Sequence, residues 1–295
     1  ASCGECSYGG GSGSQHSVKL NELRWLLLDE FQDFSPKLYQ LIGAMRRYNP
    51  QLKIFCVGDD WQAINGFAGA STTFLLDFAK WFPNGACAHL LYNRRSAREI
   101  VEAGNKLMAK YPPPAKVYKH KQFGEIKVTS LDKVEFNPKG ENSLDRAYLF
   151  EQLAFDNDYA AARTLKVAHH IAGHKAAAGK KIVVLSRTER LHNVLLADYE
   201  RKLHKLLGGR GDIHFSTIHK YKGLEADFVV LANVCEYTAP LIHPDNLLQS
   251  IFYDSEKAAW DEALEEELRL FYVALSRAKK RISILTMTGE ESRFL

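Results

Sequence analysis

Two acidic residues directly follow a short apolar segment near the start of this sequence. Asp29 and Glu30 come after the three leucines 26–28, where a strand buried on both faces of a parallel sheet is expected to end. Ligands of open α/β sheets bind at the carboxyl ends of strands. Carboxylates placed there can hold Mg²⁺, with phosphate oxygens completing its shell, and can orient a water molecule. The alternative is that both are solvated turn residues.

The following segment predicts the elements that would position these carboxylates. Ser35 and Pro36 suit the start of a helix with one apolar face, and Asn49-Pro50 ends it. Residues 52–57 then form a second strand, which makes a strand–helix–strand unit with parallel strands. Gly58-Asp59-Asp60 should therefore emerge at the same sheet edge as Asp29 and Glu30. We expect three or four carboxylates around one crevice.

Two arginines stand at a further junction between a strand and a helix. Arg94 and Arg95 follow the predicted strand 90–92 and open a helix that runs to about residue 110. The planar guanidinium group suits phosphate, so these side chains could reach the same crevice. Without further context, a solvated basic turn is the simpler interpretation.

Composition shifts divide the chain into segments. The glycine- and serine-rich residues 1–17, with Cys3 and Cys6, read as a linker or tag-like segment, and prolines near residue 112 break helix and sheet. We therefore predict a first α/β unit at 18–111, a linker at 112–122 and a second α/β unit at 123–295. Within the second unit, we predict strands at 126–129, 182–185, 213–216, 228–232 and 282–286, and helices at 160–175, 190–207 and 258–276.

Overall composition is that of an ordinary globular protein. The chain has 295 residues, 46% of them hydrophobic, and a net charge of +4, which is compatible with a polyanionic partner but too weak to argue for one. Its five cysteines show no paired framework, and no apolar run approaches the length of a membrane span. These features predict a cytoplasmic protein with no membrane partner.

Five motifs in this order resemble those of UvrD/Rep-type superfamily 1 DNA helicases, with Trp61 leaning toward the helicase IV branch. They are LLLDEFQD (26–33), VGDDWQAINGFAGA (57–70), LLYNRRS (90–96), STIHKYKGLEADFVVL (216–231) and EEELRLFYVALSRAKKR (265–281). The resemblance covers nearly all of the chain after residue 17. It implies an α/β fold of two RecA-like parallel-sheet lobes, the first incomplete, with a nucleotide cleft between them.

The resemblance also implies roles for individual residues. Asp29 and Glu30 would hold Mg²⁺ and polarise the water that attacks ATP, and Gln62 would sense the γ-phosphate. Arg95 from the first half and Arg277 from the second would neutralise charge in phosphoryl transfer from opposite walls. Further nucleotide contacts would come from Arg94 and Glu225, and nucleic-acid contacts from Trp61, Phe67, Thr217, His219 and Lys222.

Other interpretations of these side chains stay open. His219 could be a structural histidine, Trp61 and Phe67 could be core residues, and Gln62 could be a turn residue. Where the family has a tyrosine that stacks on adenine, this chain has Arg94, which could stack as a cation.

One expected motif is absent from these 295 residues. The phosphate-binding loop G-x-x-x-x-G-K-[ST] does not occur, and the segment 173–181 has one residue too many between its glycines. We therefore expect the parent protein to be an ATP-dependent DNA helicase or translocase that moves 3′ to 5′ and acts on single strands or junctions. We expect this chain alone to be inactive. The alternatives are a non-catalytic nucleic-acid- or protein-binding module, and half of a split helicase completed by a chain that supplies the P-loop.

Overall fold

The computed structural model describes residues 5–7, 17–111, 113–118, 124–133, 159–173, 177–189, 212–236, 238–241 and 256–295. Two compact units emerge, residues 1–89 and 90–295, and each is described by itself. The division lies earlier than the linker predicted at 112–122. Its cause is helix α4 (Arg98–Leu107), which buries Ile100 and Val101 and packs against elements of the second unit.

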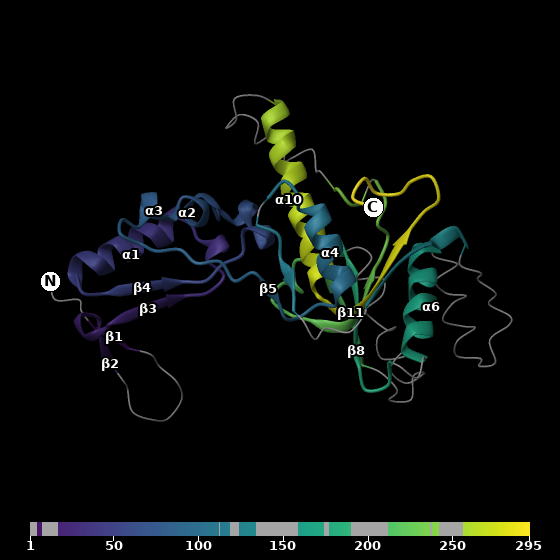
Figure 1. The fold of residues 1–295 in the computed structure, drawn as a ribbon, viewed down its shortest axis with the longest axis horizontal. Coiled ribbons are helices and arrows are strands. Elements are labelled where there is room, and N and C mark those ends of the chain that lie inside the picture. Colours follow the sequence, from purple (N-terminus) through teal and green to yellow (C-terminus); the bar gives the residue numbers. More distant parts are fainter. Residues whose placement is uncertain are drawn as a thin grey trace. The chain divides into compact units, whose positions relative to one another are not determined.

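The first unit contains a parallel strand pair joined by a helix (Figure 1). Its elements are β1 (Glu5–Ser7), β2 (Ser17–Lys19), β3 (Trp25–Leu28), α1 (Pro36–Tyr48), β4 (Lys53–Cys56), α2 (Thr73–Leu76) and α3 (Phe78–Trp81). The predicted strand–helix–strand unit is confirmed in β3, α1 and β4. The antiparallel pair β1–β2 joins the predicted linker segment 1–17, which contains β1 and the first residue of β2, to the start of the first unit.

An aromatic core fills the space beneath α1. The Ser35 hydroxyl accepts a hydrogen bond from the Leu38 amide and Pro36 occupies the first turn, as predicted. The buried members of this core are Phe31, Phe34, Ile42, Phe74 and Phe82.

The other face of the β3–β4 pair is open. Leu27 is 70% exposed and Phe55 is 55% exposed, so the prediction that the leucine strand is buried on both faces is wrong. The reason is that successive side chains of a strand point to opposite faces, and within this unit α1 and the aromatic core cover only one of them.

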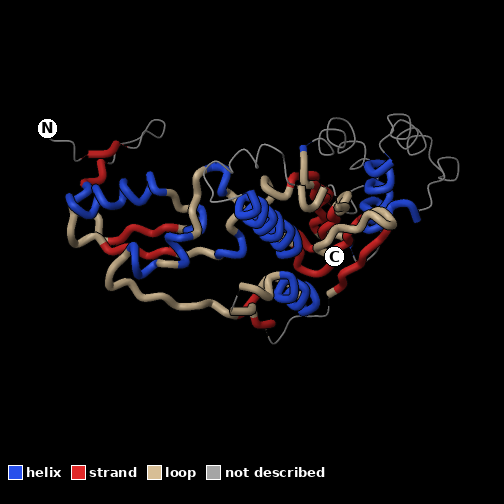
Figure 2. Tube along the Cα trace, turned by 90° about the horizontal axis from the view of Figure 1, so that it is seen from above, coloured by secondary structure: helices blue, strands red, loops and turns tan. Residues whose placement is uncertain are grey.

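The second unit is built on a five-stranded parallel sheet, whose strands are among those drawn in red in Figure 2. The strand order is β7-β11-β10-β8-β9. Its elements, in chain order, are β5 (Tyr92–Asn93), α4 (Arg98–Leu107), β6 (Lys116–Val117), β7 (Glu125–Ser130), α6 (Tyr159–Gly173), β8 (Lys181–Ser186), β9 (Asp212–Thr217), β10 (Ala226–Leu231), α10 (Glu256–Ser276) and β11 (Ala278–Thr286).

Both faces of the central strands are buried, as expected for a parallel sheet. Val184 and Val230 pack toward α6 with Leu165, whereas Val183 and Val229, one position along, are equally buried on the opposite face. The five strands and the helices at 160–175 and 258–276 are confirmed as elements, and the helix predicted at 190–207 lies outside the described residues. The last strand begins earlier than the predicted 282–286, because β11 starts at Ala278, two residues after α10 ends.

Cysteine placement follows the apolar context of each residue. Cys235 is buried and Cys56 is half-buried, and burial raises the pKa of the Cys56 thiol to about 11.

Across the ranges given above, we found no helix with the length and apolar character that a membrane span requires.

Candidate nucleotide and nucleic-acid site

The acidic residues of the first unit lie on two loops that the strand pair brings together. The Phe31 amide donates to the Val57 carbonyl at 2.8 Å, and the Val57 amide donates to the Leu28 carbonyl at 2.9 Å. These bonds continue the β3–β4 pairing beyond the strands. Asp29 and Glu30 therefore leave the same sheet edge as Gly58 and Asp59, as predicted.

Gln32 connects the two loops. Its side-chain oxygen accepts from the Asp59 amide at 2.9 Å, and its Nε2 donates to the Glu30 carboxylate. A Cβ added at Gly58 would lie 3.0 Å from the Gln32 amide nitrogen, so the loops approach closely where a glycine stands. Glu30 has a φ of +51°, a strained conformation for a non-glycine residue. The position of the Glu30 side chain is therefore set both by its backbone conformation and by the hydrogen bond that its carboxylate accepts from Gln32.

The carboxylates at this edge suit a metal ion shared with a phosphate ligand rather than a cage of protein ligands. Asp29 and Glu30 are exposed, with the Asp29 carboxylate accepting from the Glu30 amide at 2.9 Å. No cluster of three potential metal-ligating side chains occurs among the described residues, so the crevice of three or four carboxylates that we expected is not formed as a metal site. Mg²⁺ commonly needs only one or two carboxylates when phosphates and waters complete its octahedron.

The loop after β4 holds Gln62 and Trp61. The Asp59 carboxylate accepts from the Trp61 amide at 3.1 Å and from Gln62 Nε2 at 2.6 Å, which orients the Gln62 amide group. Trp61 is only 6% exposed, which favours a core role over base stacking. The side chain of Phe67 lies outside the described residues.

In the second unit, Asn93 shapes the arginine loop. Its side-chain oxygen accepts from the Arg95 amide at 3.0 Å and from the Ser96 amide at 2.9 Å. Arg94 lies with its guanidinium 4.5 Å from the ring centre of Tyr118, a cation–π contact. Arg95 Nε donates to Glu225 at 2.9 Å. Both arginines thus belong to the second unit, whereas we had placed them in the first.

Glu225 is the centre of a charged cluster. One carboxylate oxygen accepts from Arg95 and the other pairs with Lys279 of β11. The hydrogen bond from Lys279, followed by that from Arg95, lowers the pKa of Glu225. Glu225 is therefore ionised and oriented between two cations.

Arg277 is fully buried at the end of α10. Its three guanidinium nitrogens donate to the Val273 carbonyl at 2.9 Å, the Leu224 carbonyl at 3.2 Å and the Ser276 hydroxyl at 2.9 Å. In this conformation the side chain ties α10 to the residue before Glu225. Its predicted contact with phosphate would require these bonds to be given up.

The turn after β9 carries the predicted nucleic-acid residues. Thr217 is buried, and its hydroxyl accepts from the Lys220 amide at 3.3 Å, while the Lys222 amide donates to the His219 carbonyl at 3.2 Å. Gly223 has a φ of +81°, which the turn requires before the chain enters β10. The turn thus places Thr217, His219, Lys222 and Glu225 on one short segment.

His219 should give the protein a pH-dependent stability. Burial, and then the nearby charges of Arg187 and Lys222, lower the pKa of His219 to about 4. Below about pH 6.5 the unfolded chain binds a proton at this residue that the folded chain does not, so stability falls with pH until about pH 4. We expect a loss of up to about 2 kcal/mol between pH 7 and pH 5, measured by urea unfolding.

His219→Gln tests this assignment. The variant should show a smaller difference in unfolding free energy between pH 7 and pH 5 than the unchanged protein. An identical pH dependence in the two proteins would exclude His219 as its source.

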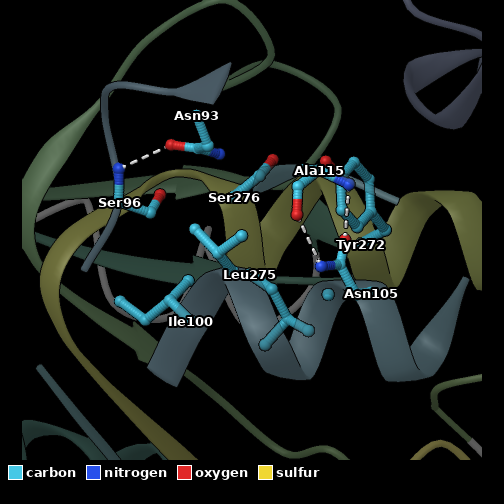
Figure 3. Close-up of a pocket in the computed structure, with 10 residues that line it drawn as sticks. Asn93, Ser96, Ile100, Asn105, Ala115, Tyr272, Leu275 and Ser276 are labelled. Carbon is cyan, nitrogen blue, oxygen red and sulfur yellow. Dashed lines mark hydrogen bonds between the residues drawn. The ribbon is translucent and has the colours of Figure 1, made fainter. Parts of the chain in front are cut away.

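A small cavity lies between α4 and α10 (Figure 3). It is lined by Ser96, Ile100, Tyr272 and Leu275 among others, and the accessible volume is only about 10 Å³. That is room for about one water molecule. The cavity is therefore a packing feature behind the Asn93 loop and does not accommodate a nucleotide.

Sequence reasoning missed several residues of the candidate sites in the two units. Gln32 lies within the first motif, and its role as a bridge between loops could have been suspected from its position. The sequence did not indicate a role for Lys279 or Tyr118, because the residues that they contact, Glu225 and Arg94, are distant in sequence.

Comparisons with known proteins agree with the motifs and the fold. Residues 16–83 match the UvrD/REP helicase N-terminal domain, and residues 185–289 match the UvrD-like helicase C-terminal domain. Parallel α/β sheets of the kind described are those of RecA-like helicase lobes. The chain belongs to the UvrD/Rep helicase family.

Among its relatives, the chain is similar to DNA helicase IV of Escherichia coli, with 28% identity over 92% of this chain and 35% of that protein. It is 26% identical to a probable DNA helicase of Mycoplasma pneumoniae over 92% of this chain and 46% of the relative. The putative ATP-dependent DNA helicase YjcD of Bacillus subtilis is 36% identical over 29% of this chain and 11% of the relative. The chain thus spans less than half the length of each of these proteins.

Proposed function

We propose that this chain provides nucleotide-hydrolysing and DNA-contacting parts of an ATP-dependent DNA helicase or translocase that moves 3′ to 5′ on single-stranded DNA. The observation that carries the proposal is the shared sheet edge at which Gln32 links the loop of Asp29 and Glu30 to the loop of Asp59 and Gln62. A solvated acidic turn would not need this connection. Membership of the UvrD/Rep family supports the same reaction.

Each candidate residue has a separate role in the proposed hydrolysis of ATP. Asp29 would hold Mg²⁺, which would supply charge neutralisation at the ATP phosphates, and Glu30 would accept a proton from the attacking water. The hydrogen bond from Gln32 orients the Glu30 carboxylate, and Asp59 orients Gln62 toward its phosphate-sensing role. Arg95 and Arg277 stabilise charge that develops on the transferred phosphoryl group.

The DNA-facing role rests on the turn after β9. Lys222 offers a positive charge for a phosphate of the strand. The lowered pKa of His219 keeps its imidazole neutral near pH 7, so it would act through hydrogen bonding or stacking rather than charge. Arg94, exposed beside Tyr118, supplies a flat cationic surface for the nucleotide base.

The absence of a P-loop motif within these 295 residues leads to a specific expectation. The 295-residue polypeptide alone should release phosphate from ATP poorly or not at all in the presence of single-stranded DNA, because the motif G-x-x-x-x-G-K-[ST], whose backbone amides bind the phosphates, does not occur in its sequence. Mixing it with a separately expressed polypeptide that carries a P-loop should restore turnover if the protein works as a split helicase.

Glu30→Gln is the control for both measurements. It should lower restored turnover by about 100-fold, since it removes the proton acceptor and keeps the side-chain size. Rapid hydrolysis by the polypeptide alone, abolished by Glu30→Gln, would show that it is active without a P-loop. Binding of single-stranded DNA with no turnover in the mixture would favour the non-catalytic module.

A further inference from the structure

The pairing of Arg95 with Glu225 and Lys279 suggests how the arginine is controlled. We propose that Glu225 holds Arg95 back from phosphate ligands, and that Lys279 is the positioning residue that keeps Glu225 neutralised when Arg95 turns away. The inference rests on the proposed function of Arg95 as a phosphate contact. In this proposal Lys279 does not contact the phosphate, and it affects phosphate binding only through its ion pair with Glu225.

The backbone around Arg95 is fixed, so its side chain is the part that can switch. The Ala97 amide donates to the Lys279 carbonyl at 2.8 Å, which attaches the start of α4 to β11. The Asn93 side chain holds the amides of Arg95 and Ser96. Gly124 makes this junction tight, because a Cβ added there would lie 2.4 Å from the Ala97 Cβ.

Glu225 is fixed equally well on the facing segment. The Leu224 carbonyl accepts from the buried Arg277 guanidinium, and the Ala226 amide donates to the Arg277 carbonyl at 3.0 Å. The Tyr221 hydroxyl donates to the carbonyl of Glu225 itself at 3.1 Å. Two rigid backbones therefore present one carboxylate to two cations.

The side chains themselves are accessible to a dissolved anion. Arg95 is 34% exposed, Lys279 38% and Glu225 41%. A phosphate that draws Arg95 away leaves Glu225 with its second cation, so the carboxylate never loses both partners. Without Lys279, releasing Arg95 would leave a carboxylate that has lost both of these cations, and the exchange would become less favourable.

Binding of inorganic tripolyphosphate to the 295-residue polypeptide, measured by calorimetry at low salt, tests the proposal. Glu225→Gln should bind about fivefold more tightly than the unchanged protein, the scale of one partly exposed ion pair. Arg95→Ala should abolish that gain when combined with Glu225→Gln. Lys279→Met should weaken binding, and Lys279→Arg should restore it.

Two controls separate this exchange from a simple change in net charge. Asp227→Asn removes one negative charge two residues away, from a carboxylate that pairs with Lys280, and should tighten binding much less than Glu225→Gln. Lys279→Met should have little effect in the Glu225→Gln background if Lys279 acts through Glu225, whereas a general electrostatic effect would be the same in both backgrounds.

Equal or weaker binding by Glu225→Gln, including no binding at all, would overturn the proposal. So would an equal effect of Lys279→Met in both backgrounds. Neither result depends on ATP turnover, so failure here is distinguishable from failure of the proposed helicase function, which phosphate release measures.

Discussion

Replacing Arg277 with methionine should lower the free energy of unfolding of the second unit by about 3–4 kcal/mol. The guanidinium is 0% exposed and donates to the Val273 carbonyl, the Leu224 carbonyl and the Ser276 hydroxyl. Methionine preserves most of the volume but removes the three hydrogen bonds that the guanidinium donates in a buried site. Urea unfolding followed by tryptophan fluorescence and circular dichroism measures the loss.

Arg281→Met is the matched control for this prediction. Arg281 lies four residues further on, in β11, and its partly exposed guanidinium pairs with Glu125. Its replacement should cost no more than about 1 kcal/mol. Equal unfolding midpoints for the two variants would mean that the buried hydrogen bonds of Arg277 contribute little to stability.

This prediction bears on the mechanism as well. If Arg277 moved to contact a phosphate, it would first break three hydrogen bonds to protein acceptors, and the folded state would lose the stability that these bonds provide. Arg95 gives up an exposed ion pair instead. We therefore expect Arg95 to be the more readily mobilised of the two arginines that we propose as phosphate contacts.

Glu267→Ala should destabilise the second unit by about 3–5 kcal/mol. Glu267 is 7% exposed, and its carboxylate accepts from Arg187 Nε at 3.0 and 3.1 Å and from the Leu241 amide at 3.0 Å. Removing it leaves a largely buried guanidinium and a backbone amide without this carboxylate. Because the pair is shielded from solvent, the loss should change little when salt is raised from 0.1 M to 1 M.

Glu265→Ala provides the comparison on the same helix. Glu265 lies two residues earlier and pairs with the exposed Lys110 at 2.7 Å. The expected loss is at most about 1 kcal/mol, and it should shrink further in high salt. If both alanine variants unfold alike, burial of the Arg187–Glu267 pair has no energetic consequence.

Much of the fold could be predicted because its signals are local. Apolar runs marked β8 and β10, alternating apolar and polar residues marked β9, and the apolar spacing from Trp260 to Leu275 marked α10. The strand–helix–strand unit of β3, α1 and β4 followed from a capping serine, a proline and an ending Asn-Pro. That unit in turn placed Asp29 and Glu30 at the same edge as Asp59.

Other features could not be predicted because they depend on which elements cover one another. Three consecutive leucines look alike in a strand covered on one face and in a strand covered on both, yet Leu27 is largely exposed. The prolines after Tyr111 suggested a domain boundary, but the packing of α4 against α10 groups residues 90–111 with the second unit.

By itself, the amino-acid sequence determined the order of the motifs, the parallel α/β class and the family, since these depend on residue types and their spacing along the chain. Only the tertiary structure decided which charged side chains are exposed to solvent and which are buried. Arg95 and Arg277 look equivalent as arginines at the ends of motifs, but one is a partly exposed partner of Glu225 and the other is buried among carbonyl groups. The physical reason is that exposure and pairing depend on which segments the fold brings together: Arg95 pairs with Glu225, 130 positions away, and Arg277 donates to the carbonyl of Leu224, 53 positions away.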